Sequence, residues 1–381
     1  MPAARVRPGQ MPTPLFDTDS MISPLRAQIT ARVADVIEAG RFVLGPEVSS
    51  FERELAAYLG VRSVVAVANG TDAITIALRA LGIRPGDEVV VPSFTFYASA
   101  EAVVTAGARP VFCDVDPDTR NVTADTVKAA LTARCRAVLA VDLFGNPAPV
   151  PEIKRLGLPV LEDAAQAAGA GLPDGRAGAL GDVATLSFYP SKNLPCFGDG
   201  GAIMSDDEGM AERARMLRFH GSRDKQTFTD VGYNSRLDEV QASILRLLLA
   251  HLDDWSAGRR EAALAYAGAG LGDHVGLPSV LEGADPAWHM YVVTHPEADA
   301  LAAALAEREV EARGYYRTPV HRQPAMASYG TAPGGLPATD ALARTNLALP
   351  MNPFIRSPQA AEVVRAIEGA TGAIGHAARV R

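Results

Sequence analysis

The feature that most constrains the fold of this chain is a repeated alternation of strand-like and helix-like segments between Val61 and Val160. Each unit has a short β-branched run, a Gly or Pro turn, and then a stretch rich in Ala and Leu. This order is typical of α/β proteins with a mainly parallel sheet. The runs carry few charges, which predicts central strands buried on both faces. We expect these strands at Ser63–Ala68, Glu88–Val91, Pro110–Val115, Ala137–Val141, Val160–Glu162 and Ala184–Phe188.

Helical periodicity extends well beyond this region. We expect helices at Asp72–Leu81 and Asp206–Phe219, and a longer one from Leu237 to about Trp255 that leads out of the first domain. A strand-like run at Met290–Thr294 and an Ala-rich helix near Asp299–Glu309 indicate a smaller α+β domain after it.

The expected domain organisation has three parts. Several prolines and no periodicity near the N-terminus favour an extended arm over residues 1–25. A large domain would cover residues 26–250, and the small C-terminal domain would cover residues 251–381.

Charge and composition argue against several classes of function. The net charge is −8, and the basic residues form no block, so we expect no nucleic-acid partner. The chain has neither an uninterrupted apolar run of about 18 residues nor an apolar leader, which predicts a cytoplasmic protein without a membrane span. Cys113, Cys135 and Cys196 are widely spaced and include no C-x-x-C pair, so we expect neither a disulfide framework nor a metal site.

A first candidate site lies where a predicted strand runs directly into a helix, in the segment ANGTDAITIALRAL. Free backbone amides and the positive end of the helix dipole would meet at Gly70 and Thr71, and this arrangement binds phosphate groups. The alternative is an ordinary strand-to-helix turn in which Thr71 caps the helix.

Two further segments place polar side chains at the ends of predicted strands. In VLEDAAQAAGA, a buried strand ends at Asp163, and Gln166 follows three residues later. A helix cap is the alternative explanation for Asp163. In TLSFYPSKNLPCFGDGGAI, Ser187 precedes Lys192 in an apolar, Gly-punctuated turn. Although a single lysine is usually a solvated surface charge, partial burial here would lower the pKa of its amine and make it nucleophilic.

These segments resemble those of the sugar aminotransferases of the DegT/DnrJ/EryC1/StrS group, which are fold-type-I pyridoxal-phosphate enzymes. The resemblance runs from about Leu15 to Phe354. It implies a large domain of mainly parallel sheet flanked by helices and a smaller C-terminal α+β domain. It rests on the ordered motifs ANGTDAITIALRALGIRPGDEVVVPSFTFYASA, ARPVFCDVDPDT, LEDAAQAAGA, GDVATLSFYPSKNLPCFGDGGAI, GYNSRLDEVQA and LALPMNPF.

The resemblance also implies a role for each matching residue. Lys192 would form the Schiff base with pyridoxal 5'-phosphate, and Asp163 would pair with the pyridinium nitrogen. Gln166 would hydrogen-bond the ring hydroxyl, and Phe96 would stack on the ring. A homodimer with shared active sites is implied as well, because the residues expected to bind the phosphate are Gly70, Thr71, Ser187 and Asn234 of the neighbouring subunit. A simple helix-capping role is the alternative for Asn234.

The implied reaction moves an amino group from glutamate or glutamine to C4 or C3 of a nucleotide-linked keto-hexose, with a dTDP-linked 6-deoxy-4-keto sugar favoured. Related sugar dehydratases carry His in place of Lys192, so the lysine favours amino transfer. Tyr316 and His321, in GYYRTPVHRQPAM, are candidates for contacting the nucleotide-sugar, and so is Arg236. A core or helix-end histidine and a plain ion pair are the respective alternatives for His321 and Arg236.

Other functions stay open at this point. Keto-cyclitol aminotransferases and aminohydroxybenzoate synthases belong to the same group. The sequence of the segment Pro195–Phe197 differs from the one most common in the family, which leaves the sugar-binding pocket undefined. A non-catalytic ligand sensor on the same fold is an alternative of another class. A nicotinamide-dependent oxidoreductase is disfavoured because no G-x-G-x-x-G turn follows the first strand.

Overall fold

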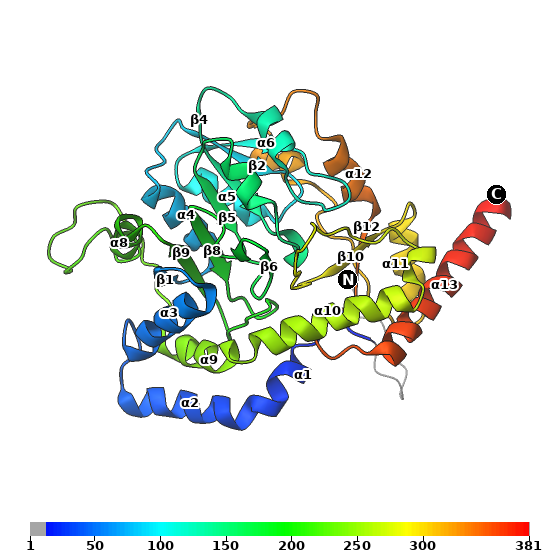
Figure 1. The fold of residues 1–381 in the computed structure, drawn as a ribbon, viewed down its shortest axis with the longest axis horizontal. Coiled ribbons are helices and arrows are strands. Elements are labelled where there is room, and N and C mark those ends of the chain that lie inside the picture. Colours follow the sequence, from blue (N-terminus) through cyan, green and yellow to red (C-terminus); the bar gives the residue numbers. More distant parts are fainter. Residues whose placement is uncertain (1–12, 381) are drawn as a thin grey trace.

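An eight-stranded sheet forms the centre of the molecule in the computed structural model, which describes residues 13–380 (Figure 1). The order of its strands is β1-β9-β8-β5-β4-β2-β3-β11. Their bounds are Ser63–Val67 (β1), Glu88–Pro92 (β2), Arg109–Cys113 (β3), Cys135–Val141 (β4), Val160–Asp163 (β5), Val183–Ser187 (β8), Gly201–Ser205 (β9) and Gly330–Thr331 (β11).

Most strand pairs in this sheet are parallel, as the sequence predicted. The exception is β9, which the sequence analysis did not identify and which lies antiparallel between β1 and β8. Because β9 is antiparallel to both of its neighbours, β1 and β8 point the same way. The carboxyl ends of β1, β2, β4, β5 and β8 therefore meet at one edge of the sheet.

Helices cover both faces of the sheet, and two apolar cores lie against it. Val65 and Val67 of β1 face one core, whereas Val64 and Ala66 face the other, as the two-residue repeat of a strand requires. The first core is formed with α4 (Gly70–Ala80), α5 (Tyr97–Thr105), α6 (Ala124–Ala130), α7 (Val150–Lys154) and α8 (Glu208–Leu217). The second is formed with α2 (Arg26–Ala39), α3 (Pro46–Leu59) and α9 (Glu239–Leu249).

A third core lies in the C-terminal part of the chain, around an antiparallel pair of strands. Its elements are α10 (Leu252–Gly268), β10 (Tyr291–Thr294), α11 (Ala298–Ala306), β12 (Asn346–Leu349) and α13 (Ser357–Val380). The helix α12 (Pro337–Thr345) and the strand β11 lie beside the large sheet, because β11 pairs with β3. The division into residues 26–250 and 251–381 stays a proposal, since part of the second range extends the sheet of the first.

The single helix expected from Leu237 to about Trp255 is in fact two helices, α9 and α10, separated at Ala250 and His251. The second helix begins with two acidic residues, Asp253 and Asp254, in its first turn. Carboxylates stabilise a helix N-terminus through the helix dipole, which accounts for a new helix starting here.

The N-terminal segment also differs from the expected extended arm where it can be described. Residues 13–25 contain the short helix α1 (Asp19–Ile22) and a 3-10 turn, and Leu15 and Met21 are each 3% exposed. Burial of these apolar side chains against the other cores stabilises a packed segment that local periodicity does not reveal. The remainder of the arm, residues 1–12, lies outside the described residues.

None of the described helices is both long enough and apolar enough to cross a membrane. The cytoplasmic location stays a prediction. Cys113, Cys135 and Cys196 are buried free thiols, and no group of three or more metal-ligating side chains occurs within residues 13–380.

Candidate active site

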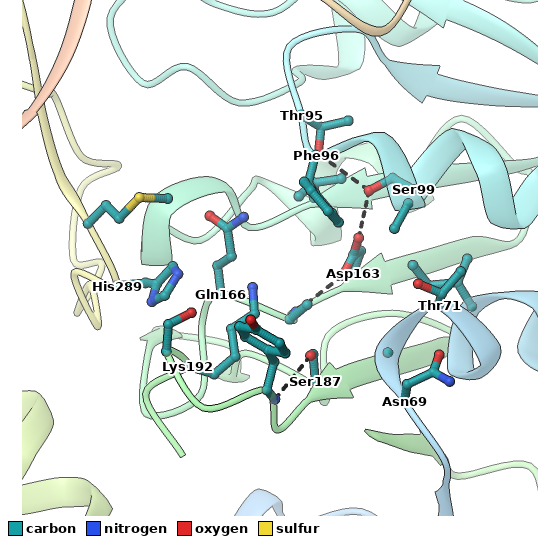
Figure 2. Close-up of a pocket in the computed structure, with 18 of the residues that line it drawn as sticks. Asn69, Thr71, Thr95, Phe96, Ser99, Asp163, Gln166, Ser187, Lys192 and His289 are labelled. Carbon is teal, nitrogen blue, oxygen red and sulfur yellow. Dashed lines mark hydrogen bonds between the residues drawn. The ribbon is translucent and has the colours of Figure 1, made fainter. Parts of the chain in front are cut away.

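The carboxyl-terminal edge of the sheet opens into a cavity of about 570 Å³ (Figure 2). Loops that follow β1, β2, β4, β5 and β8 line this cavity, together with residues of the C-terminal part such as His289 and Tyr316. In sheets with parallel strands, ligands bind in the crevice at the carboxyl ends of the strands. The position of the cavity therefore follows from the strand order.

One end of the cavity is built to hold an anion. Asn69 caps α4, and its side-chain oxygen accepts a hydrogen bond from the amide of Asp72 at 2.8 Å. The cap is thus Asn69 and not Thr71, and the amides of Gly70 and Thr71 in the first turn have no acceptor within the helix. Ser187, at the end of β8, lies directly beside Gly70 at this end of the cavity.

Asp163 lies at the floor of the cavity, at the end of β5, and is 4% exposed. Its carboxylate accepts hydrogen bonds from Ser99 Oγ at 2.8 Å and from the amide of Ala165 at 3.2 Å. Burial raises the pKa of Asp163, while these bonds and the charge of Lys192 oppose the rise. No helix follows Asp163 in this part of the structure, so the helix-cap explanation is wrong.

Lys192 enters the same cavity from the loop after β8 (Figure 2). Its backbone amide donates to the carbonyl of Tyr189 at 2.8 Å, which closes a turn, and the next side chain, Asn193, is bonded to the carbonyl of Ala287. Burial lowers the pKa of the Lys192 amine to about 8, and Asp163 only partly opposes this. A neutral, nucleophilic amine is therefore well populated near neutral pH.

Gln166 and the aromatic residues form the remaining walls. Gln166 Oε1 accepts from the amide of Phe144 at 2.7 Å, and Nε2 donates to the Tyr316 hydroxyl at 3.2 Å. Tyr316 stacks on Phe144 with ring centroids 5.9 Å apart and planes 5° apart. Phe96, at the start of α5, is 57% exposed and lines the cavity.

Three of the predicted site residues do not line the cavity of their own chain: Asn234, Arg236 and His321. Asn234 is exposed and forms an isolated antiparallel β-bridge with Phe219. The N-cap of α9 is Asp238, so Asn234 does not cap that helix. His321 Nδ1 lies 2.6 Å from the hydroxyl of Ser93, beyond the end of β2. Their predicted contacts with phosphate or sugar stay predictions.

Comparison with known proteins identifies the family. Residues 24–368 match the model of the DegT/DnrJ/EryC1/StrS aminotransferase family. The chain belongs to this family. It is similar to the dTDP-3-amino-3,4,6-trideoxy-alpha-D-glucose transaminase of Streptomyces venezuelae, with 45% identity over 93% of this chain and 95% of that protein.

Solved structures of this aminotransferase family share the fold of the chain. The crystal structure of S. venezuelae DesV in complex with a ketimine intermediate superposes with a TM-score of 0.91 and 43% identity, covering 95% of this chain and 99% of that one. The structure of NtdA from Bacillus subtilis with bound cofactor PMP gives a TM-score of 0.85 and 30% identity, covering 94% of this chain and 85% of that one. The predicted family, fold class, enzyme class and sugar amino transfer are confirmed.

The residues of the cavity fit a pyridoxal-type cofactor such as the PMP bound in the NtdA structure. A Cβ atom on Gly70 would lie 2.8 Å from Ser187 Cβ, so only glycine keeps the anion-binding end concave. Asp163 is a buried carboxylate with a raised pKa, and a protonated ring nitrogen beside it would supply a compensating positive charge. Lys192 provides the amine at the opposite wall.

Several cavity residues of this aminotransferase were not predicted from the sequence, among them Asn69, Thr95, Ser99 and His289. Ser99 lies one helical turn after Phe96, so helical spacing could have placed it on the same side. His289 has no comparable local signal, because only the packing of the C-terminal part brings it to the cavity.

Replacing Gly70 with alanine should weaken binding of pyridoxal phosphate at least tenfold, an effect of about 1.4 kcal/mol or more. The added Cβ would press on Ser187 and separate the two sides of the anion-binding end. Titration of the cofactor-free protein, followed by absorbance, measures the effect. Gly268→Ala is the matched control, since a Cβ there meets nothing within 4 Å. Equal affinity of Gly70→Ala and wild type would show that the phosphate binds elsewhere.

Proposed function

We propose that this enzyme uses pyridoxal phosphate to transfer an amino group from glutamate or glutamine to C3 of a dTDP-linked keto-6-deoxyhexose. The observation that carries the proposal is a single cavity in which Lys192 faces Asp163 beside an anion-binding helix end. Of the two carbons considered, C3 is favoured by the printed name of the S. venezuelae relative. The product would serve amino-sugar biosynthesis in the cytoplasm.

The cofactor would be held at both ends. Gly70, Thr71 and Ser187 would bind its phosphate, because the first-turn amides of α4 and the Ser187 hydroxyl converge there. Asp163 would bind the ring nitrogen, and Gln166 the ring hydroxyl, while Phe96 would cover one ring face. When bound, pyridoxal phosphate supplies an electron-withdrawing ring that stabilises negative charge on the carbon that loses its proton.

The proton is moved by Lys192. Its Nζ accepts the proton that leaves the α-carbon of the amino donor, and in the second half-reaction it delivers a proton to C3 of the sugar. A pKa of about 8 suits both roles, since the amine can take up and release a proton near neutral pH. Asp163 would pair with the ring nitrogen of the cofactor, and its bonds from Ser99 and Ala165 hold the carboxylate in place.

The direct test is to incubate the cofactor-loaded enzyme with glutamate or glutamine and a panel of dTDP- and UDP-linked keto-sugars that also includes a keto-cyclitol. Mass spectrometry and the proton couplings of the product identify the sugar and the aminated carbon. We expect an amine at C3 of a dTDP-linked sugar. Amination only at C4, or only of a keto-cyclitol, would redirect the assignment within the family. No amine product from any member of the panel would favour a non-catalytic sensor.

We also infer that the active site is shared between two subunits, with Asn234 donating to the phosphate of the neighbouring site. This inference is supported by the exposed position of Asn234, away from the cavity of its own chain. Tyr316, His321 and Arg236 are the candidates for binding the nucleotide-sugar, and of the three only Tyr316 lines the cavity of its own chain.

Mixing two inactive variants, Lys192→Ala and Asn234→Asp, should restore activity. In a mixed dimer, one site keeps the wild-type residue at both positions, and random exchange would give about a quarter of the wild-type activity. The aspartate would repel the phosphate, which accounts for inactivity of that variant alone. Lys192→Ala mixed with Asp163→Asn is the control, because both residues line the cavity of one chain and no site is repaired. Confirmed subunit exchange without recovered activity would contradict the role of Asn234.

A further inference from the structure

His289 lines the cavity close to Lys192, although no functional motif contains it (Figure 2). The residue is only 3% exposed, and its Nδ1 atom is sealed from solvent without a hydrogen-bond partner in the described structure. The large majority of buried polar side-chain atoms have a partner, so an unpaired ring nitrogen at a reactive cavity requires an explanation.

The backbone around His289 is fixed from several directions. Asn193, the residue after Lys192, donates to the carbonyl of Ala287 at 2.8 Å, and Arg259 donates to the carbonyl of Trp288 at 3.1 Å. Two backbone bonds also join this segment to residues 144–145. Trp288 has a φ of 38°, a conformation that non-glycine residues rarely adopt. Rigid surroundings of this kind are typical of side chains whose position matters for function.

The surroundings keep the imidazole of His289 neutral. Burial lowers the pKa of His289 far below its usual range, and the positive charges of Lys192 and Arg259 lower it further. A neutral ring carries one N–H group. Because a buried N–H without an acceptor is rarer than a buried acceptor without a donor, the hydrogen belongs on Nε2. His289 is therefore a neutral donor at the cavity wall.

The two half-reactions require this part of the cavity to contact substrates of different charge. Amino donors carry an α-carboxylate, whereas the sugar presents uncharged hydroxyl groups beside its keto carbon. None of the described residues that line the cavity is an arginine, and Lys192 is occupied by the reaction itself. An arginine that bound the carboxylate would be left as an unpaired charge opposite the sugar, which is unfavourable. A neutral N–H donor can serve both substrates in turn.

On the basis of the proposed function, we propose that Nε2 of His289 binds the α-carboxylate of the amino donor and, in the second half-reaction, a sugar hydroxyl next to the keto carbon. His289 is thus a substrate-contacting residue that lets one cavity accept an anionic and an uncharged substrate. The same role applies to glutamate and glutamine, which share the α-carboxylate.

Binding of two keto-acid probes tests this assignment without turnover. The enzyme is loaded with the cofactor in its aldehyde form and titrated calorimetrically with 2-oxoglutarate or with 4-oxopentanoate. The second probe has a methyl group where 2-oxoglutarate has its α-carboxylate. We expect His289→Phe to weaken the binding of 2-oxoglutarate at least tenfold and to change the affinity for 4-oxopentanoate by less than about threefold. Only the first probe loses a charge-assisted hydrogen bond. His289→Gln, which can still donate, should retain most of the affinity.

Two further variants guard against indirect effects. His289→Met also lacks the donor and adapts to an irregular core, so it replaces His289→Phe if that variant does not fold. His295→Phe removes a histidine that does not line the cavity and should leave both affinities unchanged. Unchanged affinity of the donor-less variants for 2-oxoglutarate, equal losses for both probes, or no binding of 2-oxoglutarate to the wild type would overturn the role of His289. Failure of the proposed function is read separately, from the keto-sugar panel.

Discussion

Lys192→Ala is expected to abolish amino transfer, lowering the rate by about four orders of magnitude or more, because the variant loses both the nucleophilic amine and the proton carrier. The fold should persist, because the backbone amide of Lys192 donates to the carbonyl of Tyr189, and alanine keeps that hydrogen bond. Single-turnover kinetics measure the loss, and circular dichroism checks the fold.

Chemical labelling of the wild type locates the same residue independently. Borohydride reduction of the cofactor-loaded protein should remove its yellow colour and leave the mass of the cofactor on the peptide that contains Lys192. Lys128→Ala, on the exposed surface of α6, is the matched control and should keep both labelling and turnover. A cofactor mass on any other lysine, or normal turnover of Lys192→Ala, would contradict the assignment.

Asp163→Asn should also reduce the rate by several orders of magnitude, because an amide cannot stabilise a protonated ring nitrogen as a carboxylate does. The structure predicts that this variant folds. The asparagine oxygen can accept from the amide of Ala165, and its amide group can donate to Ser99 Oγ. A rate within about tenfold of wild type would count against the role of Asp163.

The stability of the cofactor-free Asp163→Asn protein gives a second measurement. Burial raises the folded-state pKa of Asp163 above its unfolded value, so the folded state binds the proton more tightly. The free energy of unfolding consequently falls as pH rises from the unfolded-state pKa to the folded-state pKa, and it stays lowered above that pH. Asparagine removes this cost, and the melting temperature at neutral pH should equal or exceed that of the wild type.

Asp142→Asn provides the control for a buried carboxyl outside the cavity. Asp142 is fully buried, and its amide donates to the carbonyl of Asp163. Burial, reinforced by the charge of Glu162, raises the pKa of Asp142 well above its usual range. Asparagine has nearly the size and shape of aspartate, and we expect activity within about tenfold of wild type. A loss as large as that of Asp163→Asn would show that buried charge, and not contact with the cofactor, sets the rate.

Local sequence was sufficient where hydrogen bonding and burial are decided within one segment. The β-branched runs became the strands of a mainly parallel sheet, because their lack of charge allows burial on both faces. The turn at Gly70 opens a helix N-terminus, and Asp163 ends its strand as expected, whereas Ser187 ends a strand that was expected to run to Phe188. Since parallel strands end at one edge, their terminal residues could be assigned to one cavity in advance.

Tertiary packing decided the remaining features, because these depend on residues far apart in the chain. The antiparallel strand β9 exists only because β1 and β8 leave a gap that it can fill with hydrogen bonds on both edges. His289 reaches the cavity through bonds from Asn193 and Arg259, neither of which is near it in sequence. Sequence by itself thus determined the family and the mainly parallel sheet, and it predicted Lys192 as the reacting lysine. The neutral wall beside that lysine, and the burial that lowers the pKa of its amine, arise only when distant segments exclude water together.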